Sequence, residues 1–310
     1  MKEGLVMDNK KYEALILIAE NGSITRTAAE MGYTQSGVTQ MINSLETELG
    51  ITLLVRTNKG AVLTNSGKAL LPFFREEHNC ELMIQQECDL MLGRETGTVN
   101  VGCLSSISAA WMPAILQSFA TRHPGIRINM RENETPEITK MLDEGRIDIA
   151  LTELSDSAAF NTTLLMQDEI KAIVPRNHPL AAQASVTMKE LCGYPFVSYS
   201  TGDTGTSEIG WPELATENKF KFNIMYSCKD DLTAIRMVEH ELGVSIAGSL
   251  MLMNYTGQVK ELPIAPPLYR SLGIMMKSGV KLLPATRSFI SCVLETMPAI
   301  MKAVSSHERQ

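Results

Sequence analysis

Apolar residues recur at helical spacing through the first fifty residues, in three successive segments. One helix is predicted over residues 8–20, and a second near residues 25–31. Gly32 follows, and glycine best tolerates the left-handed conformation that ends many helices. A third helix is predicted to begin at Thr34, whose hydroxyl can cap it. Its buried stripe consists of residues three or four positions apart, namely Val38, Ile42, Leu45 and Leu49.

The opposite face of the third helix is polar and carries no charge. It consists of Ser36, Thr39, Gln40 and Asn43, with Gln35 at its tip. A short helix, a glycine turn and a helix with this face are typical of a DNA-binding helix-turn-helix. Gln and Asn can pair bidentately with adenine in the major groove. Any amphipathic helix also has a polar outer face, so periodicity alone leaves both interpretations open.

Two short apolar runs around residues 58–60 predict a β-hairpin, the wing of such a domain. From this hairpin Arg56 and Lys59 can reach a phosphate or the minor groove, although a solvated turn also explains Lys59. A long helix is predicted over residues 66–92. Because it is apolar on one side and lies outside any compact domain, we expect it to pair with another chain.

From residue 98 the predicted strands and helices alternate. Strands are predicted at 99–102, 126–130, 147–151, 169–174, 195–199, 244–247 and 272–276, and helices at 107–120, 136–144, 232–241 and 284–297. Alternating βαβ units argue for an α/β sheet with largely parallel strands.

Residues 12–71 resemble, without a gap, the N-terminal domain of LysR-type transcriptional regulators. The residues that carry the resemblance are Gly22, Ser23, Ala28, Ala29, Thr34, Gln35, Ser36, Val38, Thr39, Ile42, Leu45, Glu46, Leu49, Gly50, Leu53, Leu54, Arg56, Leu63, Thr64, Ser66 and Gly67.

The resemblance continues more weakly to about residue 300, where the chain is similar to the effector domain of that family. The matching positions are Gly102, Pro113, Phe119, Pro124, Gly125, 144–148, 178–180 and 243–246. Gly248 departs from the family, which commonly has proline there, and the departure is expected to loosen the loop at Ser249.

The resemblance implies the organisation of the whole chain. A winged helix-turn-helix, mainly α, is expected in residues 1–65, followed by a dimerisation linker helix in 66–93 and a hinge in 94–97. Residues 98–310 are expected to form a bilobal α/β effector-binding domain resembling type 2 periplasmic binding proteins. Its subdomain I takes about 98–166 and 268–304, and subdomain II about 167–267.

The resemblance also implies the partners. The expected partners are double-stranded DNA with an interrupted palindromic operator and further copies of the chain, as a dimer of linker-helix dimers. RNA polymerase is a further candidate, and no membrane is expected. The expected DNA-binding residues are Arg26, Thr34, Gln35, Ser36, Thr39, Gln40, Asn43, Arg56 and Lys59.

A small-molecule effector of unknown identity is expected between the two subdomains, and no cofactor or metal. Ser105 and Ser106 follow a strand and open a helix, where backbone N–H groups can bind a small anion, although plain N-capping explains them as well. Thr135 has the same two interpretations. No arginine stands at the matched positions, so anion binding stays open. The remaining candidates are Ser200 and Thr201, which an ordinary turn also explains, and Ile246 and Ala247 as an apolar wall.

Charge and composition refine this picture. The net charge is −7, but residues 1–70 hold seven basic and seven acidic residues, so non-specific attraction to phosphate should be weak. The chain has no export leader and no apolar run long enough to span a membrane, which predicts a cytoplasmic protein. Six scattered cysteines form no CxxC pair. Buried, reduced thiols are expected, and a thiol redox sensor is the alternative that the sequence leaves open.

No catalytic fingerprint occurs in the sequence, so an enzyme is not expected. The alternatives to an effector-controlled regulator are a constitutive DNA-binding repressor and a solute-binding module, because a fold alone does not fix a function. The sequence names neither the effector nor the operator, and does not separate activation from repression.

Overall fold

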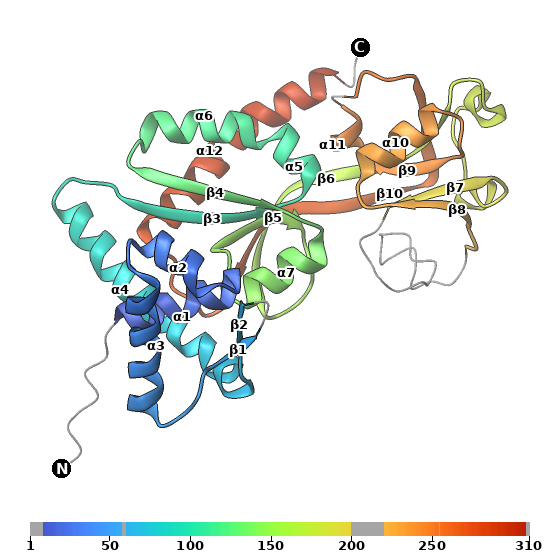
Figure 1. Ribbon diagram of the computed structural model, residues 1–310. Coiled ribbons are helices and arrows are strands. Elements are labelled where there is room, and N and C mark those ends of the chain that lie inside the picture. The colour runs from blue at the N-terminus through green and yellow to red at the C-terminus, as the bar shows by residue number, and fades with distance from the viewer. Residues whose placement is uncertain (1–8, 58–59, 200–219, 254, 308–310) are drawn as a thin grey trace. The chain divides into compact units, whose positions relative to one another are not determined.

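The computed structural model describes residues 9–57, 60–199, 220–253 and 255–307 (Figure 1). The chain forms two compact units. The first unit comprises Met1–Gly97 with Lys281–Arg287, and the second comprises Thr98–Val280 with Ser288–Gln310. Along the described ranges, no helix is both long enough and apolar enough to cross a membrane.

The first unit contains a three-helix head, a hairpin and one long helix. Its elements are α1 (Asn9–Asn21), α2 (Ile24–Met31), α3 (Gln35–Leu49), β1 (Leu54–Thr57), β2 (Gly60–Leu63) and α4 (Asn65–Met91). These bounds confirm the predicted helices and the predicted hairpin, whose strands pair antiparallel with Val55 opposite Val62. The helices surround one apolar core, in which the ring of Tyr12 on α1 stacks on Phe74 of α4 at 4.9 Å between centroids.

The second half of α4 packs on residues 281–287 within the same unit. The side-chain oxygen of Gln86 accepts a hydrogen bond from the backbone N–H of Ala285 at 3.1 Å. Glu87 forms an ion pair with Arg287 at 2.6 Å. One face of this part of the helix is therefore covered by its own chain.

The second unit is built on a six-stranded sheet with the order β4-β3-β5-β10-β6-β9, and a two-stranded sheet of β7 and β8 (Figure 1). Its strands are β3 (Gly97–Cys103), β4 (Ile126–Glu132), β5 (Ile149–Glu153), β6 (Phe160–Pro175), β7 (Pro195–Tyr199), β8 (Asn223–Cys228), β9 (Ser245–Gly248) and β10 (Val259–Lys277). Its helices are α5 (Ser105–Ala110), α6 (Met112–Arg122), α7 (Thr135–Asp143), η1 (Pro179–Ala182), α8 (Met188–Leu191), α10 (Asp231–Glu239), α11 (Ser249–Leu252) and α12 (Pro284–His307).

The prediction of a largely parallel sheet is wrong. In the six-stranded sheet β3 and β5 pair parallel, whereas β10 pairs antiparallel with both β5 and β6, and β6 with β9. The two strands β6 and β10 have 16 and 19 residues and run through both lobes of the unit (Figure 1). The sequence predicted only a short apolar part of each, because polar residues and prolines interrupt the apolar pattern in the remainder.

The helix predicted over residues 107–120 is two helices, α5 and α6, which meet at Trp111. Pro113 lies at the start of α6, where its missing N–H costs nothing. Trp111 itself is fully buried.

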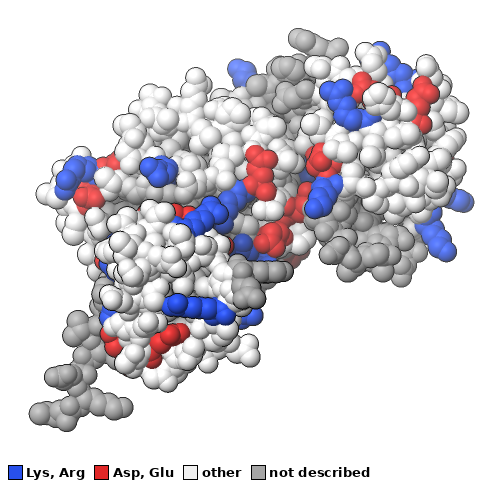
Figure 2. Space-filling view, in the orientation of Figure 1, with Lys and Arg blue, Asp and Glu red and all other residues white. Residues whose placement is uncertain are grey.

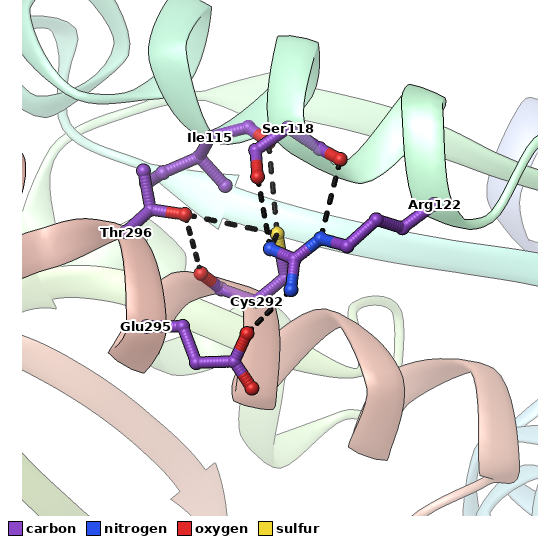
Figure 3. A network of polar contacts seen from close by, with 6 residues as sticks. All are labelled: Ile115, Ser118, Arg122, Cys292, Glu295 and Thr296. Atoms are coloured by element: carbon purple, nitrogen blue, oxygen red, sulfur yellow. Dashed lines mark hydrogen bonds and ion pairs between the residues drawn. The ribbon is translucent and has the colours of Figure 1, made fainter.

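Helices α6 and α12 are joined by a polar network (Figure 3). The guanidinium of Arg122 forms an ion pair with Glu295 and donates to the sulfur of Cys292 at 2.9 Å. It also donates to the hydroxyl of Ser118 at 2.9 Å. Cys292 is buried and Arg122 is partly exposed, so the network links the interior of this helix pair to its solvent-exposed edge.

Candidate functional site

The turn between α2 and α3 has the predicted geometry. Gly32 ends α2 in the left-handed conformation, with φ of 72°. Thr34 then caps α3, since its hydroxyl accepts the N–H of Gly37 at 3.1 Å. The hydroxyl oxygen of Ser36 lies 3.0 Å from that of Thr34, so both hydroxyls gather at the first turn of α3.

The apolar stripe of α3 is buried in the head, and its polar face is open. Val38, Ile42 and Leu45 are buried, and Leu49 packs on the same core from its edge. On the other side the exposed residues are Thr34, Gln35, Ser36, Gln40 and Asn43, with Thr39 half-buried. The amides of Gln35 and Gln40 make no side-chain hydrogen bond within the part of the chain that the structure describes. Their donors and acceptors are therefore available to a partner.

Few cations flank this face. Arg26 on α2 is 70% exposed and forms an ion pair with Glu30 one turn away, at 3.1 Å. Arg56 on β1 is exposed and has no acidic partner among the described residues. Lys59 lies outside the described residues. On the face displayed in Figure 2, basic and acidic side chains of the described residues are interspersed and form no extended basic surface.

In the second unit, a buried charge pair lies beside the serines predicted to contact an effector. Ser105 is the first residue of α5 and half-buried, and Ser106 is buried. The hydroxyl of Ser106 accepts a hydrogen bond from the guanidinium of Arg270 on β10 at 3.3 Å. Arg270 also forms an ion pair with Asp168 on β6 at 2.8 Å. The predicted region therefore contains an arginine, although none stands at the positions matched to the family.

Asp168 organises the surrounding loop. It is fully buried, and one of its oxygens accepts from both the hydroxyl of Ser249 and the N–H of Leu250, each at 2.8 Å. A Cβ atom at Gly248 would overlap the other carboxylate oxygen and the guanidinium of Arg270. The expectation that Gly248 loosens the loop is wrong, because the glycine makes room for the charge pair that holds Ser249.

Thr135 opens α7, and its hydroxyl oxygen lies 3.1 Å from that of Thr152 at the end of β5. Two carboxylates lie at helix starts, Glu134 before α7 and Asp231 at the first position of α10, and the charge of Arg270 acts on both. Burial raises the pKa of Glu134, and the negative charge of Asp231 raises it further. Burial likewise raises the pKa of Asp231, against the influence of Arg270. This region thus holds partly desolvated acids as well as hydroxyls.

The remaining effector candidates differ in position. Ile246 and Ala247 on β9 are fully buried, and they point into two separate apolar clusters of the unit. Ser200 and Thr201 lie outside the described residues.

Sequence reasoning missed Arg270 and Asp168. The two stand directly opposite each other in the register of β6 and β10, although more than a hundred residues separate them in the chain. Asp168 stands between Gln167 and Glu169, and Arg270 between Tyr269 and Ser271, so neither stood out locally as a charge within an apolar run.

Expectations for other reactive residues had mixed outcomes. The prediction of buried thiols holds for Cys103 and Cys292, but is wrong for Cys80 and Cys88, which are exposed on α4. The ring nitrogen of His178 accepts the N–H of Leu180 at 3.2 Å. Within the described ranges, no group of three or more His, Cys, Asp or Glu residues could hold a metal ion.

Comparison with known proteins agrees with both units. Residues 10–68 match the family described as "Bacterial regulatory helix-turn-helix protein, lysR family", and residues 92–298 match "LysR substrate binding domain". A relative of known sequence is the probable HTH-type transcriptional regulator LrrA of Synechococcus elongatus. It is 27% identical over 296 residues, covering 95% of this chain and 99% of the relative.

Solved structures share the fold. A full-length OxyR variant from Pseudomonas aeruginosa matches with a TM-score of 0.72 and 19% identity, over 94% of each chain. Full-length CbnR in complex with its target DNA matches with a TM-score of 0.61 and 16% identity, over 94% of this chain and 100% of that chain.

The two family matches together cover most of the chain, in the order of its two units. Proteins of this family regulate transcription and are not enzymes. The chain therefore belongs to the LysR family of transcriptional regulators, with an N-terminal helix-turn-helix DNA-binding domain followed by a substrate-binding domain.

Proposed function

We propose that α3 enters the major groove of DNA and reads bases with its uncharged polar face. Gln35, Ser36, Thr39, Gln40 and Asn43 would contact base edges or nearby phosphates. The observation that carries this assignment is that this face is open while the apolar stripe of the same helix is buried. Amides of this kind can pair bidentately with adenine.

The contacts to the sugar–phosphate backbone come from the edges of the head. Arg56 would hold a phosphate from the wing, because it has no competing acid among the described residues. Lys59 and Arg26 are the further cations, the latter after releasing Glu30. The hydroxyls of Thr34 and Ser36 share one hydrogen bond, so the pair keeps one further proton to donate to a phosphate.

The head is electrically neutral, so a single copy should bind weakly. We infer that affinity comes from several copies on one operator. The active species would be a dimer of dimers formed through α4 on an interrupted palindrome, and RNA polymerase is a candidate partner of the bound assembly. Such a regulator works where the chromosome is, in the cytoplasm.

The effector would bind in the second unit, near the starts of α5 and α7. Ser105, Ser106 and Thr135 would contribute hydroxyls and backbone N–H groups, and Arg270 a charge. Ser200 and Thr201 remain candidates from the sequence, and Ile246 and Ala247 would act from behind the site by packing. Binding would shift the equilibrium between two arrangements of the lobes and so reset the spacing of the heads.

The test is footprinting of the purified full-length protein on the DNA upstream of its own coding region, at two salt concentrations. Protection of an interrupted palindrome is expected. Gln35→Ala should then weaken binding by about 1–3 kcal/mol and relax specificity at one position of each half-site. The matched control is Gln117→Ala, because Gln117 is an exposed glutamine on α6 of the other unit.

Unchanged affinity of Gln35→Ala for the preferred site would remove that residue from base reading. If neither the upstream DNA nor selection from random sequences yielded a site, this assignment of α3 would fail.

A further inference from the structure

One face of α4 is left uncovered by its own chain. Residues spaced three or four apart form a stripe along it, and three of them are large apolar side chains with high exposure. Phe73 is 65% exposed, Ile84 66% and Met91 84%. Two exposed cysteines, Cys80 and Cys88, lie in the same stripe on either side of Ile84. Apolar spacing of this kind marks a helix that packs on another helix.

The centre of the stripe is hollowed into a shallow groove of about 500 Å³. Ile84 lies at the middle of its lining, and the two cysteines stand four residues before and four residues after it. An acidic residue lies at the end nearer the head, and a cation at the other end. The lining includes Glu77, Cys80, Ile84, Cys88, Leu92 and Arg94.

The charges favour one orientation for a second copy in this groove. In a parallel pair, Glu77 and Glu81 would face the same acids of the partner, and like charges at close range repel. In an antiparallel pair, the end that carries Glu77 lies along the end that carries the partner's Arg94. Arg94 is 63% exposed beside Asp89, so it can reach a second acid. Antiparallel packing also opposes the two helix dipoles.

We propose that, where α4 packs antiparallel on α4 of a second copy about a two-fold axis near Ile84, Cys80 and the partner's Cys88 form a regulatory disulfide. The proposal rests on the assembly through α4 proposed above and adds a covalent, redox-sensitive lock to it. Two equivalent bonds form in each dimer, one on each side of the axis.

The geometry of packed helices permits the bond. Cys80 and Cys88 lie four residues on either side of Ile84, about 6 Å along the helix in each direction. A two-fold axis at Ile84 therefore brings each cysteine level with the other cysteine of the partner. Helix axes about 8–10 Å apart, with Cα atoms about 2.3 Å from each axis, leave facing Cα atoms about 3–5 Å apart at the closest. A disulfide needs about 4.4–6.8 Å between Cα atoms, which these helices reach with a small offset.

The oxidant is a low-molecular-weight disulfide such as oxidised glutathione. The thiolate of Cys80 attacks one sulfur of that disulfide, forms a mixed disulfide and releases one glutathione thiolate. The thiolate of the partner's Cys88 then attacks the sulfur of Cys80 and releases the second glutathione. Two protein thiols are oxidised, one glutathione disulfide is reduced to two thiols, and the protons of the cysteines pass to the released thiolates through solvent.

The lock would change regulation by fixing the linker pair. A reduced dimer held by one helix face dissociates on dilution, whereas the bridged dimer does not. Oxidation would therefore keep two heads together at low protein concentration and hold the spacing between them constant.

The experiment uses the full-length protein in buffers of oxidised and reduced glutathione, followed by electrophoresis without reductant. Light scattering on the reduced protein gives its mass first. The variants are Cys80→Ser, Cys88→Ser and the double variant, which measures the background from the other cysteines. The two single variants are also co-expressed with different tags. Both positions are exposed, so the melting temperatures should stay within about 2 °C of the unmodified chain, since surface substitutions usually change stability by less than about 0.5 kcal/mol.

The unmodified chain should convert mainly to a covalent dimer, and each single variant should fall to the background of the double variant. Co-expression of the two single variants should restore a covalent heterodimer, because one Cys80 then faces one intact Cys88. Single variants that still cross-link separately would show a parallel pair and overturn the proposal. A reduced dimer that forms no bond in the unmodified chain would overturn the disulfide alone. A reduced monomer would overturn the assembly through α4 as well.

Discussion

The charge pair between Asp168 and Arg270 should be the most sensitive point of the second unit. Asp168 is fully buried and Arg270 is 9% exposed, so neither charge is compensated by solvent. Asp168→Asn keeps the volume of the side chain and one oxygen that can accept from Ser249 and Leu250. It removes the negative charge that stands 2.8 Å from the guanidinium, and so leaves a buried cation with less compensating charge.

The expected cost follows from that change. Removing one partner of a buried ion pair costs about 3–5 kcal/mol, mainly because the remaining charge stays desolvated. For a unit of this size, about 2–4 °C of melting temperature corresponds to 1 kcal/mol, so Asp168→Asn should lower the transition by about 6–20 °C. Arg270→Met removes the opposite charge. The double variant should cost about 1–3 kcal/mol less than the sum of the two single variants, because they share one interaction.

The assay is denaturant unfolding followed by tryptophan fluorescence. Both tryptophans of the chain belong to the second unit, so this signal is specific to it. Using one spectroscopic signal from one unit avoids the error of treating two units as a single two-state transition. The matched control is Glu261→Gln, which breaks a more exposed ion pair with Lys171 across the same two strands. That change should cost less than about 1 kcal/mol.

Two results would refute this reasoning. A loss below about 1 kcal/mol for Asp168→Asn, similar to the control, would mean that solvent reaches the pair. Strict additivity of the two single variants would mean that Asp168 and Arg270 do not stabilise each other. In either case the buried pair could not be the element that holds the loop at Ser249.

Three further changes test other parts of the second unit. Gly248→Ala should destabilise it by about 1–3 kcal/mol, because the added methyl group overlaps the charge pair, and the fluorescence transition measures this loss. Glu134→Gln should raise the melting temperature at pH 7–8 but not near pH 4, because a carboxyl with a raised pKa destabilises the fold only once pH rises through that pKa. The pKa of Glu239 is lowered to about 2, first by the hydrogen bond from Tyr255 and then by the N–H of Gln258 and the guanidinium of Arg236. This stabilisation is present above pH 4.5 and is lost as pH falls toward 2. Tyr255→Phe should therefore flatten the dependence of the melting temperature on pH between 5 and 3, and an unchanged slope would contradict this.

The head of the protein could be derived almost entirely from the sequence. Its signals are local: the spacing of Val38, Ile42 and Leu45 sets the buried stripe of α3, and Gly32 and Thr34 set its start. Helical contacts and caps join residues at most four positions apart, so their partners are visible in a short stretch of sequence. The same locality made the wing and the length of α4 predictable.

The second unit depends on contacts that no local pattern contains. The sequence predicted alternating strands and helices, but the antiparallel register that places Arg270 opposite Asp168 exists only once β6 and β10 pair. From the sequence, Gly248 was expected to loosen the loop at Ser249. In the folded chain, its missing side chain leaves room for the buried charge pair of Asp168 and Arg270. Likewise, Cys80 and Cys88 are exposed because residues 281–287 cover a different face of α4. Helical periodicity is a property of residues that are close in the chain. Burial and charge pairing are properties of surfaces that come together from distant segments. The sequence by itself therefore determined the elements, and the tertiary structure decided their environment.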